Sequence, residues 1–216
     1  MQPLGLLFLL CSLIATGYCI SCKSCWHLQG TPCSGSSVDC ATGEVCVAAV
    51  TNTLLITGPL TEQYTLSCGN PSQCDVNGSL TFYYGSIRTA TSCCSANNCV
   101  PPTPTVPTKS TVKNGLTCRT CSSDDSSYCY TGETMECTGN EFKCGRMARS
   151  LSGSVTKKDA IRGCATKSYC EIIGNQVTSI QGLNVDMKMY CSDGATALHA
   201  AFFLSAAVLL LTKLLF

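Results

Sequence analysis

Twenty cysteines in a chain of 216 residues restrict what this sequence can fold into, because that density is typical of domains held together by disulfides. Eight of the cysteines recur after 96 to 98 residues, which indicates an internal duplication. The first copy contains Cys22, Cys25, Cys33, Cys40, Cys46, Cys68, Cys74 and Cys93, and the second contains Cys118, Cys121, Cys129, Cys137, Cys144, Cys164, Cys170 and Cys191. Each copy spans about 75 residues, a size at which a domain needs disulfides to be stable.

The segment between the copies predicts the domain boundaries. Residues 101–114 contain four of the eight prolines of the chain and no core-forming run, so we expect an extended Pro/Thr-rich linker whose threonines are candidate O-glycosylation sites. The first domain is then 20–100 and the second is 115–192.

The N-terminal end predicts secretion. Residues 1–19 contain an apolar run from Leu4 to Ala15 followed by small residues, a pattern typical of a signal peptide. Cleavage after Cys19 leaves 18 cysteines, an even number that can all form disulfides, and is preferred to cleavage after Gly17. The alternative interpretation is a buried N-terminal helix.

The C-terminal end predicts a lipid anchor. An apolar segment runs from Ala200 to Phe216 and follows the small residues Ser192-Asp193-Gly194, which is the pattern of a glycosylphosphatidylinositol (GPI) anchor signal over 193–216, removed when the lipid is attached. Ser192 is the predicted attachment residue, with Asp193 and Gly194 as alternatives. A single-pass membrane helix is the competing interpretation.

Between the two ends the pattern predicts strands and turns. Residues 46–51 and 62–68 flank a Gly58-Pro59 turn, and Asn77-Gly78 is a strong two-residue hairpin signal. Residues 185–191 alternate between apolar and polar side chains, as a half-buried strand does. No segment of 20–194 shows a sustained helical period, so we expect an all-β structure.

The cysteine spacing resembles a known family. Cys22-x2-Cys25-x7-Cys33-x6-Cys40-x5-Cys46, then Cys68, Cys74 and the cluster Cys93-Cys94-Ser-Ala-Asn97-Asn-Cys99, is similar to the Ly-6 antigen/urokinase-receptor (LU) domain. The resemblance covers both copies and implies a small disulfide-rich, all-β fold with two tandem three-finger (LU) domains. Among two-domain relatives the pattern is most similar to the γ-type phospholipase A2 inhibitors of plasma.

The resemblance also implies a disulfide pairing, which the sequence alone does not determine. The implied pairs are Cys22–Cys46, Cys25–Cys33, Cys40–Cys68, Cys74–Cys93, Cys94–Cys99, Cys118–Cys144, Cys121–Cys129, Cys137–Cys164 and Cys170–Cys191. Two departures from the family pattern stand out. Val100 occupies the position of the asparagine that ties the knot in relatives, and the second copy stops at its eighth cysteine, without the last bridge.

Catalytic, cofactor and metal sites are not predicted. His27 is the only histidine between the two terminal signals, and it is more consistent with a surface residue beside a packed Trp26 than with a catalytic base. Phosphate-binding loops and metal-binding helices are absent from the sequence, and disulfide formation leaves no thiolates for zinc. A net charge of +1 and an extracellular destination argue against a nucleic-acid partner.

Charge and glycosylation signals supply the remaining candidate sites. The first domain has a net charge of −2 and the second +1, and the central finger of the second is basic. Its residues Arg146, Arg149, Lys157, Lys158 and Arg162 are candidate contacts for an acidic partner or an anionic membrane, with a solvated fingertip as the alternative. Asn77 begins the only N-glycosylation sequon, at a predicted hairpin tip.

These observations predict a GPI-anchored protein-binding module of the receptor or co-receptor type on the outer face of the plasma membrane. Its partner would be an extracellular or cell-surface protein. The alternatives are a secreted inhibitor of phospholipase A2 or of a protease, and a secreted three-finger signalling ligand.

Overall fold

A computed structural model describes residues 19–29, 32–153, 155–180 and 183–194. The predicted signal peptide, apart from Cys19, and the predicted anchor signal beyond Gly194 lie outside these residues. Within the described ranges, Cys19 is the one cysteine without a disulfide, and no helix has the length and apolar character needed to cross a membrane.

Three β-hairpins, or fingers, form the first module. Their strands are β1 (Ser21–Leu28) and β2 (Ser36–Asp39), β3 (Val45–Leu55) and β4 (Thr61–Gly69), and β5 (Asn77–Phe82) and β6 (Gly85–Cys94). A 3-10 helix, η1 (Pro71–Gln73), precedes the third finger and is capped by the Asn70 side chain. The β3–β4 hairpin agrees with the predicted strands on either side of Gly58-Pro59.

The second module repeats this order. Its strands are β7 (Lys113–Arg119), β8 (Cys121–Ser123), β9 (Thr134–Thr138), β10 (Lys143–Gly153), β11 (Lys157–Ala165), β12 (Asn175–Ile180) and β13 (Leu183–Ser192). A helix, α2 (Lys167–Ile173), replaces η1; it begins after the N-cap Thr166 and ends at Gly174, which has a positive φ of 41°. The sequence prediction missed α2 because seven residues are too few to display a helical period.

Nine disulfides hold the fingers at their bases. They are Cys22–Cys46, Cys25–Cys33, Cys40–Cys68, Cys74–Cys93, Cys94–Cys99, Cys118–Cys144, Cys121–Cys129, Cys137–Cys164 and Cys170–Cys191. These are the same pairs that the family resemblance implies. The predicted all-β, disulfide-rich fold of two three-finger modules is confirmed.

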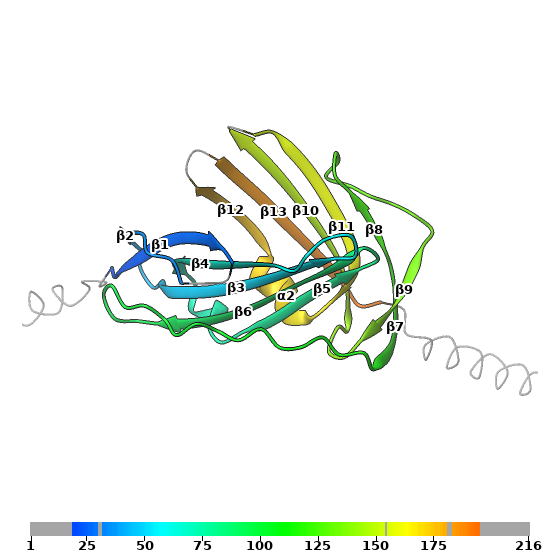
Figure 1. The fold of residues 1–216 in the computed structure, drawn as a ribbon, viewed down its shortest axis with the longest axis horizontal. Helices are drawn as coiled ribbons and strands as arrows, with labels where there is room; N and C mark the ends of the chain where they lie inside the picture. Colours follow the sequence, from blue (N-terminus) through cyan, green and yellow to red (C-terminus); the bar gives the residue numbers. More distant parts are fainter. Residues whose placement is uncertain (1–18, 30–31, 154, 181–182, 195–216) are drawn as a thin grey trace, which may run out of the picture.

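The two modules are joined into one sheet (Figure 1). Its strand order is β12-β13-β10-β11-β5-β6-β3-β4-β1-β2, with β8 paired to β11 and with β7 and β9 in a separate two-stranded sheet. The join is between β5 and β11, where Thr81 pairs with Cys164 and Leu80 with Ala165. The third finger of the first module therefore lies against the second module.

The segment predicted as a linker lies against the first module. Figure 1 shows it running alongside β6. Pro101 is buried, and Val106 packs against a buried cluster of Ala48, Val50, Tyr64 and Leu66. Strand β7 starts at Lys113, so the last two residues of the predicted linker lie in a strand.

Two asparagines tie the first disulfide knot although Val100 cannot. The side chain of Asn97 accepts a hydrogen bond from the Ser21 amide at 2.8 Å, and the Asn98 amide donates to the Ser21 carbonyl at 2.7 Å. Both asparagines lie in the short loop closed by Cys94–Cys99. These contacts, one to the Asn97 side chain and one from the Asn98 backbone, tie this loop to β1 although Val100 replaces the family's asparagine.

The predicted hairpin tip at Asn77-Gly78 is wrong. These residues begin β5, and the two-residue turn of the third finger is Tyr83-Tyr84. A Cβ atom on Gly78 would lie 2.9 Å from the Tyr169 Cα, so the glycine permits close packing against α2 rather than a turn.

Candidate binding surfaces

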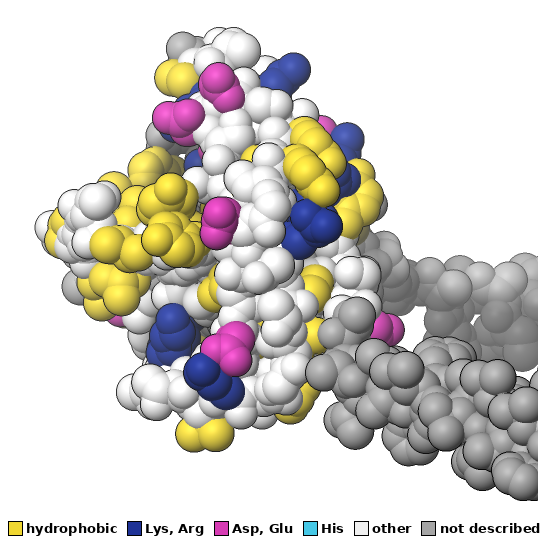
Figure 2. Space-filling model, turned by 90° about the vertical axis from the view of Figure 1, so that its right-hand side faces the viewer, with side chains coloured by type: hydrophobic (Ala, Val, Ile, Leu, Met, Phe, Trp, Pro, Cys, Tyr) yellow, Lys and Arg dark blue, Asp and Glu magenta, His cyan; other side chains and the backbone are white. Residues whose placement is uncertain are grey.

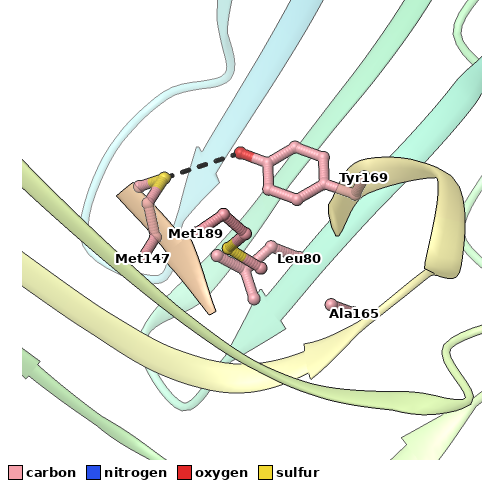
Figure 3. Close-up of a cluster of buried hydrophobic side chains, with 5 residues drawn as sticks. All are labelled: Leu80, Met147, Ala165, Tyr169 and Met189. Atoms are coloured by element: carbon pink, nitrogen blue, oxygen red, sulfur yellow. Dashed lines mark hydrogen bonds between the residues drawn. The ribbon is translucent and has the colours of Figure 1, made fainter. Parts of the chain in front are cut away.

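A buried hydrophobic cluster fixes the two modules relative to each other. Leu80 of β5 is fully buried among side chains of the second module, and Figure 3 shows it beside Met189 and Ala165. The Tyr169 hydroxyl donates to the Met147 sulfur at 3.7 Å, and burial raises the pKa of Tyr169, which keeps this hydroxyl protonated. Any surface that combines residues of both modules is therefore preformed.

A buried carboxylate also links the modules. Glu141, between β9 and β10, is only 6% exposed. It accepts hydrogen bonds from the hydroxyls of Ser79 and Thr81 on β5, both at 2.7 Å. Burial raises the pKa of Glu141, and the two hydrogen bonds, together with the positive charges of Lys109 and Arg88, offset only part of that shift.

A Glu141→Gln substitution is expected to stabilise the protein at neutral pH. The folded state binds the Glu141 proton more tightly than the unfolded state does, so the wild-type protein loses stability as the pH rises from the unfolded pKa through the folded one. Glutamine keeps an oxygen that accepts from both hydroxyls but carries no charge to desolvate. The gain over wild type, measured by chemical denaturation, should shrink as the pH is lowered towards the unfolded pKa. The exposed Glu133→Gln is the control; a variant destabilised at neutral pH would contradict the prediction.

A cavity of about 450 Å³ opens between the modules beside Glu141. Asn77, the predicted glycosylation site, is exposed at its rim, and its carbonyl accepts a hydrogen bond from the Ser168 hydroxyl. The Ser79 hydroxyl, the third position of the sequon, is bound to Glu141 in the folded protein. A glycan on Asn77 would stand at the mouth of this cavity.

One face of the second module combines basic and aromatic side chains. Arg146 of β10 lies opposite Arg162 of β11 and Tyr190 of β13 in the sheet register, and side chains so paired point to the same face. The guanidinium carbon of Arg146 lies 4.5 Å from the centroid of the Tyr190 ring and 5.4 Å from that of Tyr128. Stacking on ring faces leaves the N–H edge of a guanidinium able to bind a carboxylate.

Two lysines extend this face. Lys158 lies opposite Ser150, and Lys188 lies opposite Ala148 and forms a 3.4 Å ion pair with Asp186. A cavity of about 340 Å³ lies between these strands and the Tyr128 loop. The set is called the Arg146 face and consists of Tyr128, Arg146, Lys158, Arg162, Lys188 and Tyr190. Its basic excess suits an acidic partner.

The five predicted contact residues do not share one surface. Arg146, Lys158 and Arg162 belong to the Arg146 face, whereas Arg149 and Lys157 point to the opposite face because side chains alternate along a strand. The Nε and Nη2 atoms of Arg149 donate to the buried carboxylate of Asp159 at 2.9 and 2.6 Å. Arg149 is therefore engaged within the protein.

Sequence reasoning missed Tyr128, Lys188 and Tyr190. Tyr128 precedes Cys129 in the first finger, and the other two lie on β13, so only the fold brings them to Arg146. The alternation of residues 185–191 was the available signal, since it places Lys188 and Tyr190 on one face of a strand.

The first module exposes apolar side chains at two neighbouring turns. The Ile56 amide donates to the Tyr84 carbonyl at 2.8 Å, which links the turn between β3 and β4 to the turn between β5 and β6. The set is called the apolar turns and consists of Leu54, Leu55, Ile56, Leu60, Tyr83 and Tyr84, each 43% to 70% exposed. Figure 2 faces this end of the molecule and shows hydrophobic side chains gathered there.

The remaining candidate residues belong to neither the Arg146 face nor the apolar turns. Ser192 ends β13 opposite Cys144, and Asp193 forms an ion pair with Lys143. His27 is exposed on β1, and its neighbour Trp26 is 42% exposed, so this tryptophan is not packed as the sequence analysis expected.

Cysteine sulfurs gather closely in the two knots, as those of Cys118, Cys137 and Cys164 do within 4.8 Å. Each of these sulfurs belongs to a disulfide, so none is a thiolate that could bind a metal ion.

Comparison with known proteins identifies two kinds of relative. The phospholipase A2 inhibitor NAI of Notechis ater is 29% identical over 182 residues, which cover 81% of this chain and 88% of the inhibitor. The urokinase plasminogen activator surface receptor of Rattus norvegicus is 27% identical over 184 residues, which cover 83% of this chain and 54% of the receptor.

Family models and solved structures were compared with the chain as well. No protein-family model matches the chain. The crystal structure of mouse TEX101 covers 80% of this chain and 99% of its own, at 16% identity and a TM-score of 0.34, a value too low to support an argument about how the modules are arranged.

Proposed function

We propose that this chain, a member of the Ly-6/urokinase-receptor family, is a GPI-anchored cell-surface module that binds an extracellular or cell-surface protein. It acts by contact rather than by catalysis. The observation that supports this most is the Arg146 face, where a disulfide-bonded sheet presents basic and aromatic side chains at the surface. Arginine and tyrosine are enriched at the centres of protein–protein interfaces.

The anchor can be tested on cells. Phosphatidylinositol-specific phospholipase C cleaves the lipid of GPI-anchored proteins, so it should release the protein from intact cells into the medium. Retention at the surface after treatment, with the sequence beyond Gly194 still present in the mature protein, would reject the anchor in favour of a membrane span.

A secreted inhibitor is the second candidate, favoured by the relative that is a phospholipase A2 inhibitor and that this chain covers over 88% of its length. A secreted three-finger signalling ligand is the remaining alternative. Both predict protein in the medium before any lipase is added, and an inhibitor would lower the hydrolysis of phospholipid vesicles by a secreted phospholipase A2.

Charge reversal on the Arg146 face tests the partner contact. Lys158→Glu should weaken the binding of the labelled ectodomain, residues 20–194, to partner-bearing cells by about tenfold or more at low salt, because it places like charge against an acidic partner. The loss should diminish as salt is added.

The neighbouring Lys157→Glu is the matched control for this contact. It changes the same charge at the same hairpin end but on the opposite face of the strand, so its effect should be clearly smaller. Equal losses for the two variants would indicate a general charge effect, and no loss for either would place the contact elsewhere.

A further inference from the structure

The apolar turns contain no charged side chain of their own. Residues 53–60 and 82–87 contain neither acidic nor basic side chains. Ile56 is 70% exposed, Tyr83 60% and Leu60 56%, so the turns present aliphatic and tyrosine side chains to solvent together. An apolar group of this kind marks an interaction surface more often than scattered single residues do.

The turns are held in place rather than free to fold back. Leu54 and Leu55 pair with Ser86 and Gly85 between β3 and β6, so the two hairpins end side by side. The Tyr83 amide donates to the Thr120 hydroxyl of the second module at 2.9 Å, and Thr120 in turn donates to the Arg162 carbonyl at 3.1 Å. The second module therefore supports the turns without covering them.

The chain leaves the structure at the same end of the molecule. Figure 1 shows the turns of the first module and the end of β13 at one side, with the hairpin of β10 and β11 extending away from them. Gly194 packs against Leu116 of β7, four residues before Thr120, which is roughly 13 Å along an extended strand. The sequence continues from here to the apolar segment Ala200 to Phe216.

The two ends of the molecule differ in chemistry. The described residues at the distal hairpin end of the second module include Val-Thr-Lys-Lys over 155–158, which carries two basic side chains. The proximal end has the uncharged apolar turns, in which tyrosines accompany leucine and isoleucine. Tyrosine and aliphatic side chains together are favoured at the boundary between lipid headgroups and acyl chains.

We infer that the apolar turns insert into the outer leaflet of the same membrane that carries the anchor. This inference rests on the proposed anchoring near Ser192, which places a bilayer beside these turns. Contact at the turns and at the anchor then holds the module against the membrane, with the basic hairpin end of the second module directed outwards.

The test uses the ectodomain, residues 20–194, which contains all nine disulfides and the buried clusters. Flotation with vesicles of phosphatidylcholine and cholesterol measures binding without lipid charge. The wild-type ectodomain should float with the vesicles, and Ile56→Ser combined with Leu60→Ser should lower the partition coefficient by at least about tenfold. Val155→Ser changes a 54% exposed aliphatic residue at the opposite end and should leave the partition coefficient unchanged.

Three outcomes would overturn the inference. They are the absence of flotation up to millimolar lipid, equal flotation of the wild type and the double variant, and sedimentation of the wild type as a dimer that the double variant abolishes. The last outcome would assign the turns to a second copy of the chain. Because the ectodomain has no lipid, the result does not depend on release by the lipase, so the anchor and the membrane contact can each fail alone.

Discussion

Replacing Leu80 with alanine is expected to lower the free energy of unfolding by about 2–5 kcal/mol. Leu80 is fully buried, and it is the side chain that β5 of the first module contributes to the cluster with Met147, Tyr169 and Met189. Its loss removes apolar contacts and leaves a cavity where the two modules meet. Chemical denaturation followed by circular dichroism measures the change.

The control for this prediction is Leu54→Ala in the same module. Leu54 is 48% exposed, so the same truncation there should change stability by no more than about 0.5 kcal/mol. Leu80→Ala should also separate the unfolding of the two modules into distinct steps. If Leu80→Ala and Leu54→Ala change the free energy of unfolding equally, the modules are not coupled through this cluster.

Loss of the Cys137–Cys164 disulfide is expected to lower the free energy of unfolding by about 3.5 kcal/mol, because this disulfide closes a loop with a sequence separation of 27 residues. Both cysteines are fully buried in the knot of the second module. The double substitution Cys137→Ser/Cys164→Ser avoids a free thiol, and denaturant titration gives the stability.

Cys94→Ser/Cys99→Ser provides the comparison within the same chain. That disulfide has a sequence separation of only 5 residues, for which the chain-entropy relation gives about 2 kcal/mol. Loss of the Cys137–Cys164 disulfide should therefore lower the free energy of unfolding more than loss of the Cys94–Cys99 disulfide does. A larger loss for the short loop would show instead that the Asn97 and Asn98 contacts to Ser21 depend on this bridge.

The sequence predicted the parts of the fold that repeat. Cysteine spacing revealed two copies, and the family resemblance supplied the nine disulfide pairs and the three fingers of each copy. Alternation located β13, and Gly58-Pro59 located the turn between β3 and β4. These features are local, or they are specified by a pattern that occurs twice.

The junction between the copies could not be predicted, because it occurs once and joins distant segments. A Cβ atom on Gly163 would lie 1.9 Å from the Thr81 carbonyl oxygen, so this glycine permits β5 to approach β11. In the sequence it is only a glycine within a strand. Glu141 likewise gives no local sign that it will be buried against Ser79 and Thr81.

The Arg146 face was predicted in part for a related reason. Clustering of basic residues in one finger identified Arg146, Lys158 and Arg162, but it also included Arg149, which the strand alternation turns towards Asp159. The tyrosines that stack on Arg146 come from two other fingers. The positions of charged residues along the chain reveal neither the face to which a strand residue points nor the contacts between different fingers.

The shared sheet also determines how the protein responds to a protease. Lys109 is exposed in the segment between the modules, so an enzyme such as trypsin can reach it. Cleavage there would break the polypeptide between the modules, and each of the nine disulfides among the described residues lies within one module and does not bridge the cut. The β5–β11 pairing and the Leu80 cluster would nevertheless keep the two halves together, so a nicked molecule would stay whole until it was denatured.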